Sequence, residues 1–184
     1  MNDVQARTET TPFWRFSLHL YRQLGVSDAC IALQDGCGVD VNLLLFLLWL
    51  ADEGQVLSAD DVRKLDDQVR DWRNLTIIPI REVRRKLKGA RTLVDPGKQE
   101  ALRNKVKALE LEAERLQQEA LYAFAQSGLL GKQAVPPAAA RGNVSAYERI
   151  MNVTFPPSAL DVLLGAFDSL EHGRSAAALA AARE

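Results

Sequence analysis

A run of nine consecutive apolar residues, residues 43–51, constrains the fold of this chain more than any other feature. Polar residues flank the run: Asp40 can cap the first free N–H groups of a helix, and Gly54 can adopt the left-handed conformation that ends one. A helix that is apolar on every face must be surrounded by protein or lipid. A membrane span needs about 20 apolar residues, and this run is only half as long. The sequence therefore predicts an all-α protein, a compact helical bundle around a buried central helix at about residues 40–53.

The composition is that of a globular protein with one sizeable core. The chain has 184 residues, of which 47% are apolar and 26% are charged, and its 23 basic and 24 acidic residues give a net charge of −1. This balance creates no overall field that would attract a polyanion or a membrane surface. We therefore expect no nucleic-acid partner and no membrane span.

The two cysteines, Cys30 and Cys37, indicate neither a metal site nor a disulfide. A structural zinc site needs four ligands, and the only histidines, His19 and His172, belong to distant segments. Buried reduced thiols in a cytosolic protein are the expected state. Residues 1–10 also lack the apolar segment of a secretory signal. We expect a cytoplasmic protein without metal or cofactor.

Two helices are expected before the central one. Thr11 can cap the first, whose apolar and aromatic residues recur at helical spacing as far as Gly25. The aromatic side chains predict a helix lying across the core, and an aromatic ligand cage is the alternative interpretation. Ser27 is expected to cap a second, short helix, which ends where Gly36 and Gly38 permit a tight turn.

Two long amphipathic helices, at about residues 59–88 and 98–127, are predicted to pair as an antiparallel hairpin. In both helices, apolar residues recur at spacings of mostly three and four residues, the pattern of helices packed lengthwise. The positions are Val62, Leu65, Val69, Trp72, Thr76, Ile80, Val83 and Leu87 in the first, and Leu102, Val106, Leu109, Ala113, Leu116, Ala120 and Ala123 in the second. The short connection between them favours pairing within one chain. A homodimeric coiled coil has the same periodicity, so both arrangements remain open.

Pro79 is expected to disturb the first of these helices. A proline inside a helix removes one N–H and clashes with the preceding turn, at a cost of about 3 kcal/mol. The residue before proline also avoids helical angles, so we expect a kink or a short interruption near residues 75–78. Irregular backbone in an otherwise regular helix is often associated with function.

Basic residues cluster after the proline, where they can stabilise the dipole of a helix C-terminus. They are Arg81, Arg84, Arg85, Lys86, Lys88 and Arg91. A solvated helix face is the simpler interpretation, and an anion-binding surface is the alternative. A nucleic-acid-binding protein is expected to have a wider basic surface than one helix end.

The chain is expected to divide into a helical domain at residues 1–131 and an appended part at residues 132–184. The proline-, alanine- and glycine-containing segment 132–144 predicts a flexible surface linker, followed by a short helical turn at residues 145–151. Ser158 is expected to cap an amphipathic helix that packs on the core as an arm. The last ten residues are alanine-rich and are expected to fray.

Several short segments form a characteristic combination, namely residues 13–18, 32–35 and 38–45, Trp72-Arg73, and the basic pattern of residues 80–88. In this combination the chain resembles, over about residues 12–127, an uncharacterised family of small proteobacterial cytosolic proteins. That family is a domain of unknown function. The resemblance therefore implies a bacterial cytosolic protein and no particular activity.

Three classes of function remain. The first is a non-catalytic interaction protein, a helical scaffold or adaptor with a protein partner or a second copy of itself. The second is a binder of a small apolar or anionic amphiphilic ligand, held in an interhelical cavity with an arginine-lined rim. Its candidate ligand-binding residues are Asp40, Asn42, Arg73, Arg81, Arg84 and Arg85.

The third class is an enzyme of unknown reaction. Its candidate residues are the polar ends of the central helix, namely Asp40, Asn42, Asp52 and Glu53, together with Arg73 and Arg81. Carboxylates at helix ends are usually caps or solvated groups, and no recognisable catalytic motif accompanies them. The sequence therefore favours a non-enzymatic protein and assigns no catalytic residue.

Overall fold

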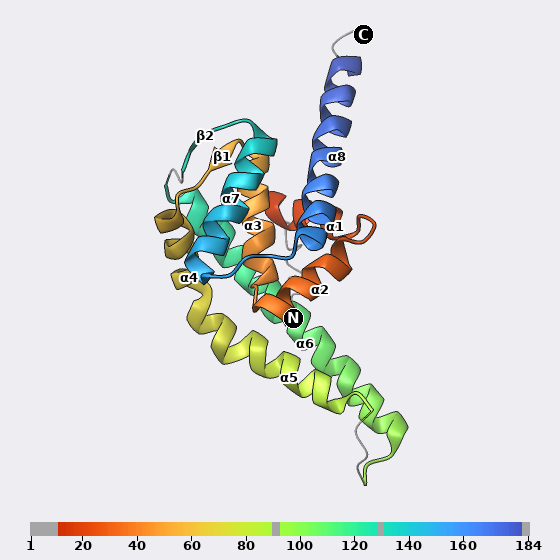
Figure 1. The fold of residues 1–184 in the computed structure, drawn as a ribbon. Helices are drawn as coiled ribbons and strands as arrows, with labels where there is room; N and C mark the ends of the chain where they lie inside the picture. The colour runs from red at the N-terminus through yellow and green to blue at the C-terminus, as the bar shows by residue number, and fades with distance from the viewer. Residues whose placement is uncertain (1–10, 90–92, 129–130, 182–184) are drawn as a thin grey trace, which may run out of the picture.

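The computed structural model describes residues 11–89, 93–128 and 131–181, with the backbone alone for residues 171–181, and it confirms the all-α fold (Figure 1). In chain order the elements are α1 (Pro12–Tyr21), α2 (Val26–Cys37), α3 (Val41–Asp52), β1 (Gln55–Val56), α4 (Ala59–Trp72), the π-helical segment η1 (Arg73–Ile77), α5 (Ile78–Leu87), α6 (Pro96–Gln126), β2 (Lys132–Gln133), α7 (Pro136–Met151) and α8 (Pro157–Ala181). The two short strands pair antiparallel, with Gln55 opposite Gln133. None of the described helices is long and apolar enough to cross a membrane.

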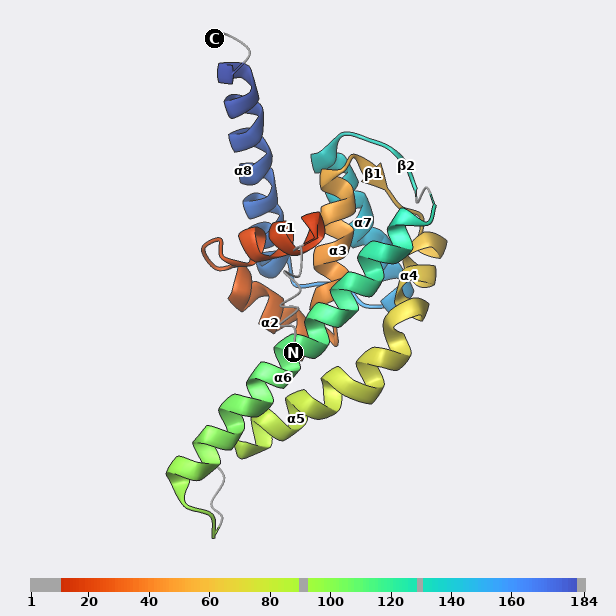
Figure 2. The same ribbon diagram turned by 180° about the vertical axis from the view of Figure 1, so that it is seen from behind.

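The central helix is α3, and it is buried on every face as predicted. Each of its residues from 42 to 51 is buried, and the helix lies among α1, α6 and α7 (Figures 1 and 2). Asp40 caps it, since its carboxylate accepts from the N–H groups of Asn42 and Leu43 at 2.9 and 3.2 Å. Gly54 follows with a φ of +74°, the left-handed conformation expected after a helix end.

The helices before α3 follow the prediction in part. The Thr11 hydroxyl caps α1 by accepting from the Trp14 N–H at 3.0 Å. The aromatic rings fill the core and do not form a cage: Phe13 packs edge-on against Phe46 with ring centroids 4.9 Å apart. The prediction that Ser27 caps α2 is wrong. The helix starts one residue earlier, at Val26, after Gly25 in the left-handed conformation. α2 continues through Gly36, and only Gly38 has the positive φ expected of both glycines.

The interruption predicted near Pro79 is present as a widened turn. Residues Arg73–Ile77 are π-helical, two residues earlier than expected, and α5 starts immediately before the proline. A π turn inserts one extra residue and so rotates every following side chain relative to the preceding helix. Ile77 is therefore buried, whereas Val83, which was predicted to face the partner helix, is 49% exposed. Trp72 precedes the π turn and contacts α6 as predicted, since its Nε1–H donates to the Ala113 carbonyl at 3.0 Å.

α5 and α6 form the predicted antiparallel hairpin, which projects from one end of the bundle (Figure 2). The prediction of which α6 residues pack holds for Ala113, which is buried, and is wrong for the leucines. Leu102, Leu109 and Leu116 are exposed by 52%, 56% and 40%, respectively. The buried residues of α6 are largely polar instead, namely Glu110, Ala113, Gln117, Gln118 and Leu121.

The prediction of a flexible linker at residues 132–144 is also wrong. α7 starts at Pro136 and packs along α3, where the small side chains of Ala139 and Ala140 are completely buried. Asn143 is buried as well and crosslinks three backbone groups. It accepts from the Leu57 N–H at 2.7 Å and donates to the carbonyls of Leu47 and Gln55 at 2.9 and 3.0 Å.

α8 packs as an arm against α2, α7 and α1. Leu163 and Phe167 are fully buried, and the Phe167 ring centroid lies 6.3 Å from that of Phe16. The helix continues to Ala181, and residues 182–184 lie outside the described part of the chain. Fraying of the last residues and the division of the chain at residue 131 stay predictions.

Candidate functional site

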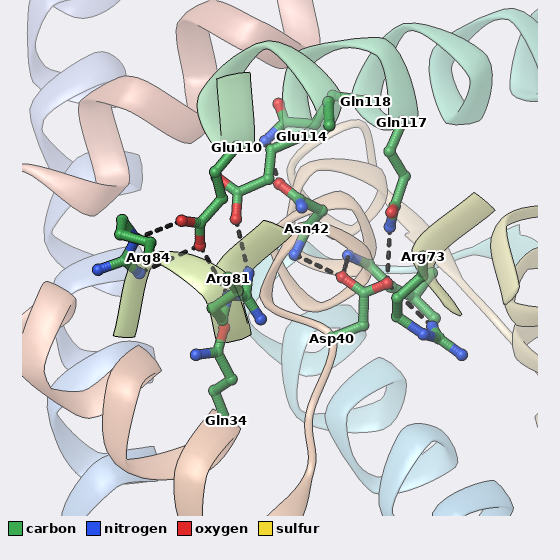
Figure 3. A network of polar contacts seen from close by, with 12 residues as sticks. Gln34, Asp40, Asn42, Arg73, Arg81, Arg84, Glu110, Glu114, Gln117 and Gln118 are labelled. Atoms are coloured by element: carbon green, nitrogen blue, oxygen red, sulfur yellow. Dashed lines mark hydrogen bonds and ion pairs between the residues drawn. The ribbon is translucent and has the colours of Figure 1, made fainter. Parts of the chain in front are cut away.

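A buried polar network is centred on Asp40 at the N-terminal end of α3 (Figure 3). One carboxylate oxygen caps the helix. The other accepts from Arg73 Nη1 at 2.9 Å and from Gln117 Nε2 at 2.6 Å. The N–H of Asp40 donates to the Tyr147 hydroxyl at 3.0 Å. Asp40 therefore joins α3 to η1, α6 and α7 through one hydrogen bond each.

The charge of this carboxylate is balanced by Arg73 on the π-helical segment. Arg73 Nη1 also donates to Asp66 at 2.8 Å, so one guanidinium serves two carboxylates. Burial disfavours the charged form of Arg73, but the attraction of Asp40 and Asp66 outweighs it and raises the pKa of the guanidinium. Arg73 is thus a fixed cation with a side chain that is only 17% exposed.

Asn42 belongs to a second branch that points away from solvent. Its Oδ1 accepts from Gln118 Nε2 at 2.8 Å, and Gln118 Oε1 accepts from the Ser17 hydroxyl at 2.9 Å. All three side chains are buried. This chain of hydrogen bonds ties α3 to α6 and α1, a structural role that leaves Asn42 outside any open site.

Further along the hairpin, two arginines of α5 bind two glutamates of α6. Arg81 donates from Nε to Glu110 at 2.9 Å and from Nη2 to Glu114 at 2.6 Å, and Arg84 binds Glu110 as well. Burial raises the pKa of Glu110, but the hydrogen bonds from Arg84 and Arg81 outweigh it and the pKa is lowered. Burial also raises the pKa of Glu114, and Arg81 offsets this only in part.

A cleft of about 470 Å³ opens beside this network, between α2, the connection to α3, η1 and α5. Its volume lies in the range of small-molecule sites. Its lining combines three arginines with acidic, polar and apolar residues: Gln34, Asp35, Gly38, Val39, Asp40, Arg73, Ile77, Ile78, Arg81, Glu82 and Arg85. Arg85 pairs with Asp35 across 2.6 Å, and both side chains are 47% exposed.

The structure brings together four of the six predicted ligand-binding residues. Asp40, Arg73, Arg81 and Arg85 all line the cleft. Arg84 does not line it and turns to Glu110 on α6. Asn42 is likewise absent from the lining and lies in the internal branch of the network.

The arrangement proposed for an enzyme does not form. Asp40 and Asp52 stand at opposite ends of α3, about 18 Å apart along the helix axis at 1.5 Å per residue. Glu53 is exposed at the same distant end. Within the described residues, no three His, Cys, Asp or Glu side chains are placed to hold one metal ion.

Sequence reasoning missed the residues that α6 and α7 contribute to the network. Gln117 and Gln118 lie between the leucines of an amphipathic helix, so their position indicated solvent exposure. Tyr147 lies in a helix that was expected to be only a short turn. Asp40 was the signal that could have revealed these residues. A charged residue at the end of a fully buried helix needs hydrogen-bond partners, and other segments of the chain must supply them.

A family model described as a protein of unknown function, DUF2390, matches residues 12–121, which is more than half of the chain. The match covers α1 to α5 and most of α6, and so every residue predicted to bind a ligand. No curated protein and no solved structure matches the chain. The resemblance to an uncharacterised family is therefore confirmed, and the chain belongs to the DUF2390 family of proteins of unknown function.

Proposed function

We propose that this protein is a non-catalytic binding protein for a small amphiphile with a carboxylate or phosphate group. The observation that carries the proposal is the cleft of about 470 Å³ lined by Arg73, Arg81 and Arg85. Guanidinium groups bind carboxylates and phosphates through paired hydrogen bonds, which matches the proposed anionic head. Val39, Ile77 and Ile78 supply apolar wall for the rest of the ligand.

The three arginines differ in how freely they can bind an added anion. Arg73 is held by Asp40 and Asp66, and Arg81 by Glu110 and Glu114, with all four contacts between 2.6 and 2.9 Å. Arg85 has one carboxylate partner, Asp35, in an exposed pair. Exposed ion pairs contribute little, so a ligand can displace Asp35 at small cost. Arg85 is therefore the anion-binding residue, and Arg73 and Arg81 supply a fixed positive background.

The test uses octyl phosphate as the probe in a calorimetric titration of the full chain. We expect saturable binding with one site per chain, and a loss of about tenfold or more in affinity in Arg85→Gln, because a charge-assisted pair is removed. Arg63→Gln is the matched control, since Arg63 is an exposed arginine that pairs with Asp60 on α4, away from the cleft lining. It is expected to bind as the unmodified chain does.

Asp35→Asn provides a second, opposite test. Removing the competing carboxylate leaves Arg85 available, so affinity for octyl phosphate is expected to rise. Absence of saturable binding to the unmodified chain would overturn the proposal. Equal affinity in the unmodified chain, Arg85→Gln and Asp35→Asn would also contradict it, because binding would then lie elsewhere.

The second candidate function is protein interaction through the α5–α6 hairpin, as a scaffold or adaptor. The observation that favours it is the set of exposed leucines on α6, Leu102, Leu109 and Leu116. Soluble monomers rarely expose large contiguous apolar patches unless these bind something. Affinity purification of a Leu109→Asp chain beside the unmodified one tests it, and identical sets of co-purifying proteins, with no self-association in either, would contradict it.

We also infer a cytoplasmic location. Cys30 and Cys37 are free thiols, which supports a reducing compartment. The resemblance of residues 12–127 to proteobacterial proteins supports a bacterial source. Fractionation of cells that express the full chain from its natural source tests the location, and recovery outside the cytoplasm would contradict it.

A further inference from the structure

The exposed face of α6 carries an apolar stripe with a strict seven-residue repeat. Leu102, Leu109 and Leu116 recur at this interval, and all three are at least 40% exposed. Residues seven apart lie nearly above one another on a helix, so the three leucines form one line. α6 has 31 residues and is about 46 Å long, and it lies on the outside of the described molecule (Figure 2).

A line of charged residues runs beside the leucines with the same repeat. Lys98, Lys105, Glu112 and Glu119 each lie three residues after, or four before, a leucine position, which puts them on one flank of the stripe. The first two are basic and the last two acidic. The change of sign falls at the middle leucine, Leu109.

The same separation of basic from acidic residues holds for the whole helix. Residues 96–109 contain four basic residues and one acidic residue, and residues 110–126 contain four acidic residues and one basic residue. Glu110 and Glu114 are bound by Arg81 and Arg84 of α5, so the complementarity to an identical helix that runs in the opposite direction is carried by Lys98, Lys105, Glu112 and Glu119. A parallel pairing would oppose like charges along its whole length.

We propose that two copies of this chain associate through α6, with the helices antiparallel and a two-fold axis at Leu109. This inference rests on the second candidate function and names its partner as a second copy. On this axis Leu109 packs against Leu109 of the second copy, and Leu102 against Leu116. Lys105 then lies beside Glu112 of the second copy, and Lys98 beside Glu119. The arrangement is self-complementary, as a two-fold interface requires.

The contacts within the chain leave these groups available. Lys98 and Lys105 form no ion pair with any other described residue, whereas Glu112 and Glu119 both bind Arg115 on their own helix at 2.7 and 2.5 Å. Such exposed pairs can be shared with a lysine of a second copy at little cost. The leucine stripe from residue 102 to 116 spans only about 21 Å, so we expect a weak, concentration-dependent dimer.

Sedimentation equilibrium of the full chain over a wide concentration range tests the proposal. We expect a monomer–dimer equilibrium that Leu109→Asp abolishes, because it places two carboxylates together at the axis. Leu111→Asp is the matched control: Leu111 is 54% exposed on the same helix, against 56% for Leu109, but points to a different side. It is expected to dimerise like the unmodified chain.

Charge reversal tests the direction and register of the pairing. Lys105→Glu and Glu112→Lys are each expected to weaken the dimer by about tenfold or more, since each creates two like-charge contacts. The chain with both changes regains opposite charges across the axis and is expected to recover the dimer. Failure of the double variant to recover would overturn the antiparallel register.

Two further outcomes would overturn self-association itself. One is a monomer at every concentration, and the other is equal loss of the dimer in Leu109→Asp and Leu111→Asp. A monomer whose Leu109→Asp variant still loses a co-purifying protein would overturn the second copy as partner and leave the interaction function of the hairpin standing. Octyl phosphate binding at Arg85 is measured in a separate experiment. A failure of the proposed ligand binding is therefore distinguishable from a failure of the dimer and from a failure of the hairpin's interaction function.

Discussion

The guanidinium of Arg73 donates to the carboxylate of Asp40 across 2.9 Å and so joins the π-helical turn to the cap of the central helix. The Asp40 side chain is 5% exposed and the Arg73 side chain is 17% exposed. A buried carboxylate is tolerated only with a partner of this kind. The pair also forms the inner wall of the cleft, so the stability of the core and the proposed binding site depend on the same contact.

Arg73→Met is expected to destabilise the protein by about 3 kcal/mol, because it leaves Asp40 buried with Gln117 as the one side-chain donor that remains to it among the described residues. Urea unfolding followed by circular dichroism measures the change. Arg70→Met is the control: Arg70 lies three residues earlier on the same helical run and pairs with Asp66 and Asp67 at the surface. Its effect is expected to be much smaller, and equal effects of the two substitutions would contradict the account.

Asn143→Ala is expected to cost about 3 kcal/mol, because it leaves the buried Leu57 N–H without its partner and removes the donor to the Leu47 and Gln55 carbonyls. Thermal unfolding of the variant provides the measurement. Asn104→Ala, at an exposed position on α6, is the matched control and is expected to stay within about 0.5 kcal/mol of the unmodified chain. A small effect at Asn143 would show that α7 is not fixed to α3 in the way described.

The ion pairs of Glu110 predict a specific loss of stability in acid. The pKa of Glu110 in the folded chain lies below its usual 4.5, despite burial, because Arg84 and Arg81 donate to it. Its contribution to the free energy of unfolding is therefore complete above pH 4.5 and is lost as the pH falls through the lower folded value. Glu110→Gln is expected to lose about 2 kcal/mol near neutral pH and to lose less on acidification than the unmodified chain.

Urea unfolding at a series of pH values from neutral to acid checks this prediction. Glu114→Gln is the comparison, because burial raises the pKa of Glu114 and its charged form is therefore unfavourable. Its substitution is expected to cost less near neutral pH than that of Glu110. Parallel pH profiles for Glu110→Gln and the unmodified chain would contradict the role assigned to Glu110.

The two cysteines are expected to differ in reactivity. Cys30 is completely buried, and burial raises the pKa of its thiol to about 12, so the reactive thiolate is absent near neutral pH. Cys37 is only half-buried, at the end of α2. An aromatic disulfide reagent is expected to modify Cys37 in the folded chain and Cys30 only after unfolding. Reaction of the folded Cys37→Ser variant at the rate of the unmodified chain would contradict this difference.

Local features of the fold could be predicted because their causes are local. The apolar run, the Asp40 cap and the interruption before Pro79 each depend on neighbouring residues. The α5–α6 hairpin follows from the short connection between two amphipathic helices. These are the elements that the structure confirms.

The predictions that were wrong depend on features that the spacing of apolar residues does not show. The π turn shifts the phase of α5, so the apolar stripe read across residues 72–83 does not stay on one face. On α6, Glu110, Gln117 and Gln118 are buried because arginine, asparagine and aspartate from distant segments bind them. α7 was missed because prolines and alanines indicated a linker, although Pro136 occupies the first helical turn, where proline is tolerated, and small residues permit close packing on α3.

The candidate site also combines features that could be predicted from neighbouring residues with contacts that form only in the folded chain. Three of the four cleft-lining predictions are arginines. Arg81 and Arg85 belong to the basic cluster predicted after Pro79, whereas Arg73 lies before the proline and was named as a candidate separately. Which of them are already bound could not be predicted, because Asp66, Glu110 and Glu114 reach them only in the folded chain. That distinction is what singles out Arg85 as the anion-binding residue.

The most direct test of the proposed cleft function is a titration of the full chain with octyl phosphate, followed through the Nε–H resonances of its arginines by NMR. The account predicts saturable shifts of the Arg85 and Arg81 resonances, with assignments confirmed by Arg85→Gln and Arg81→Gln. The Arg63 resonance is expected to stay unchanged. A titration that leaves Arg85 unshifted, or shifts Arg63 to the same extent, would contradict it.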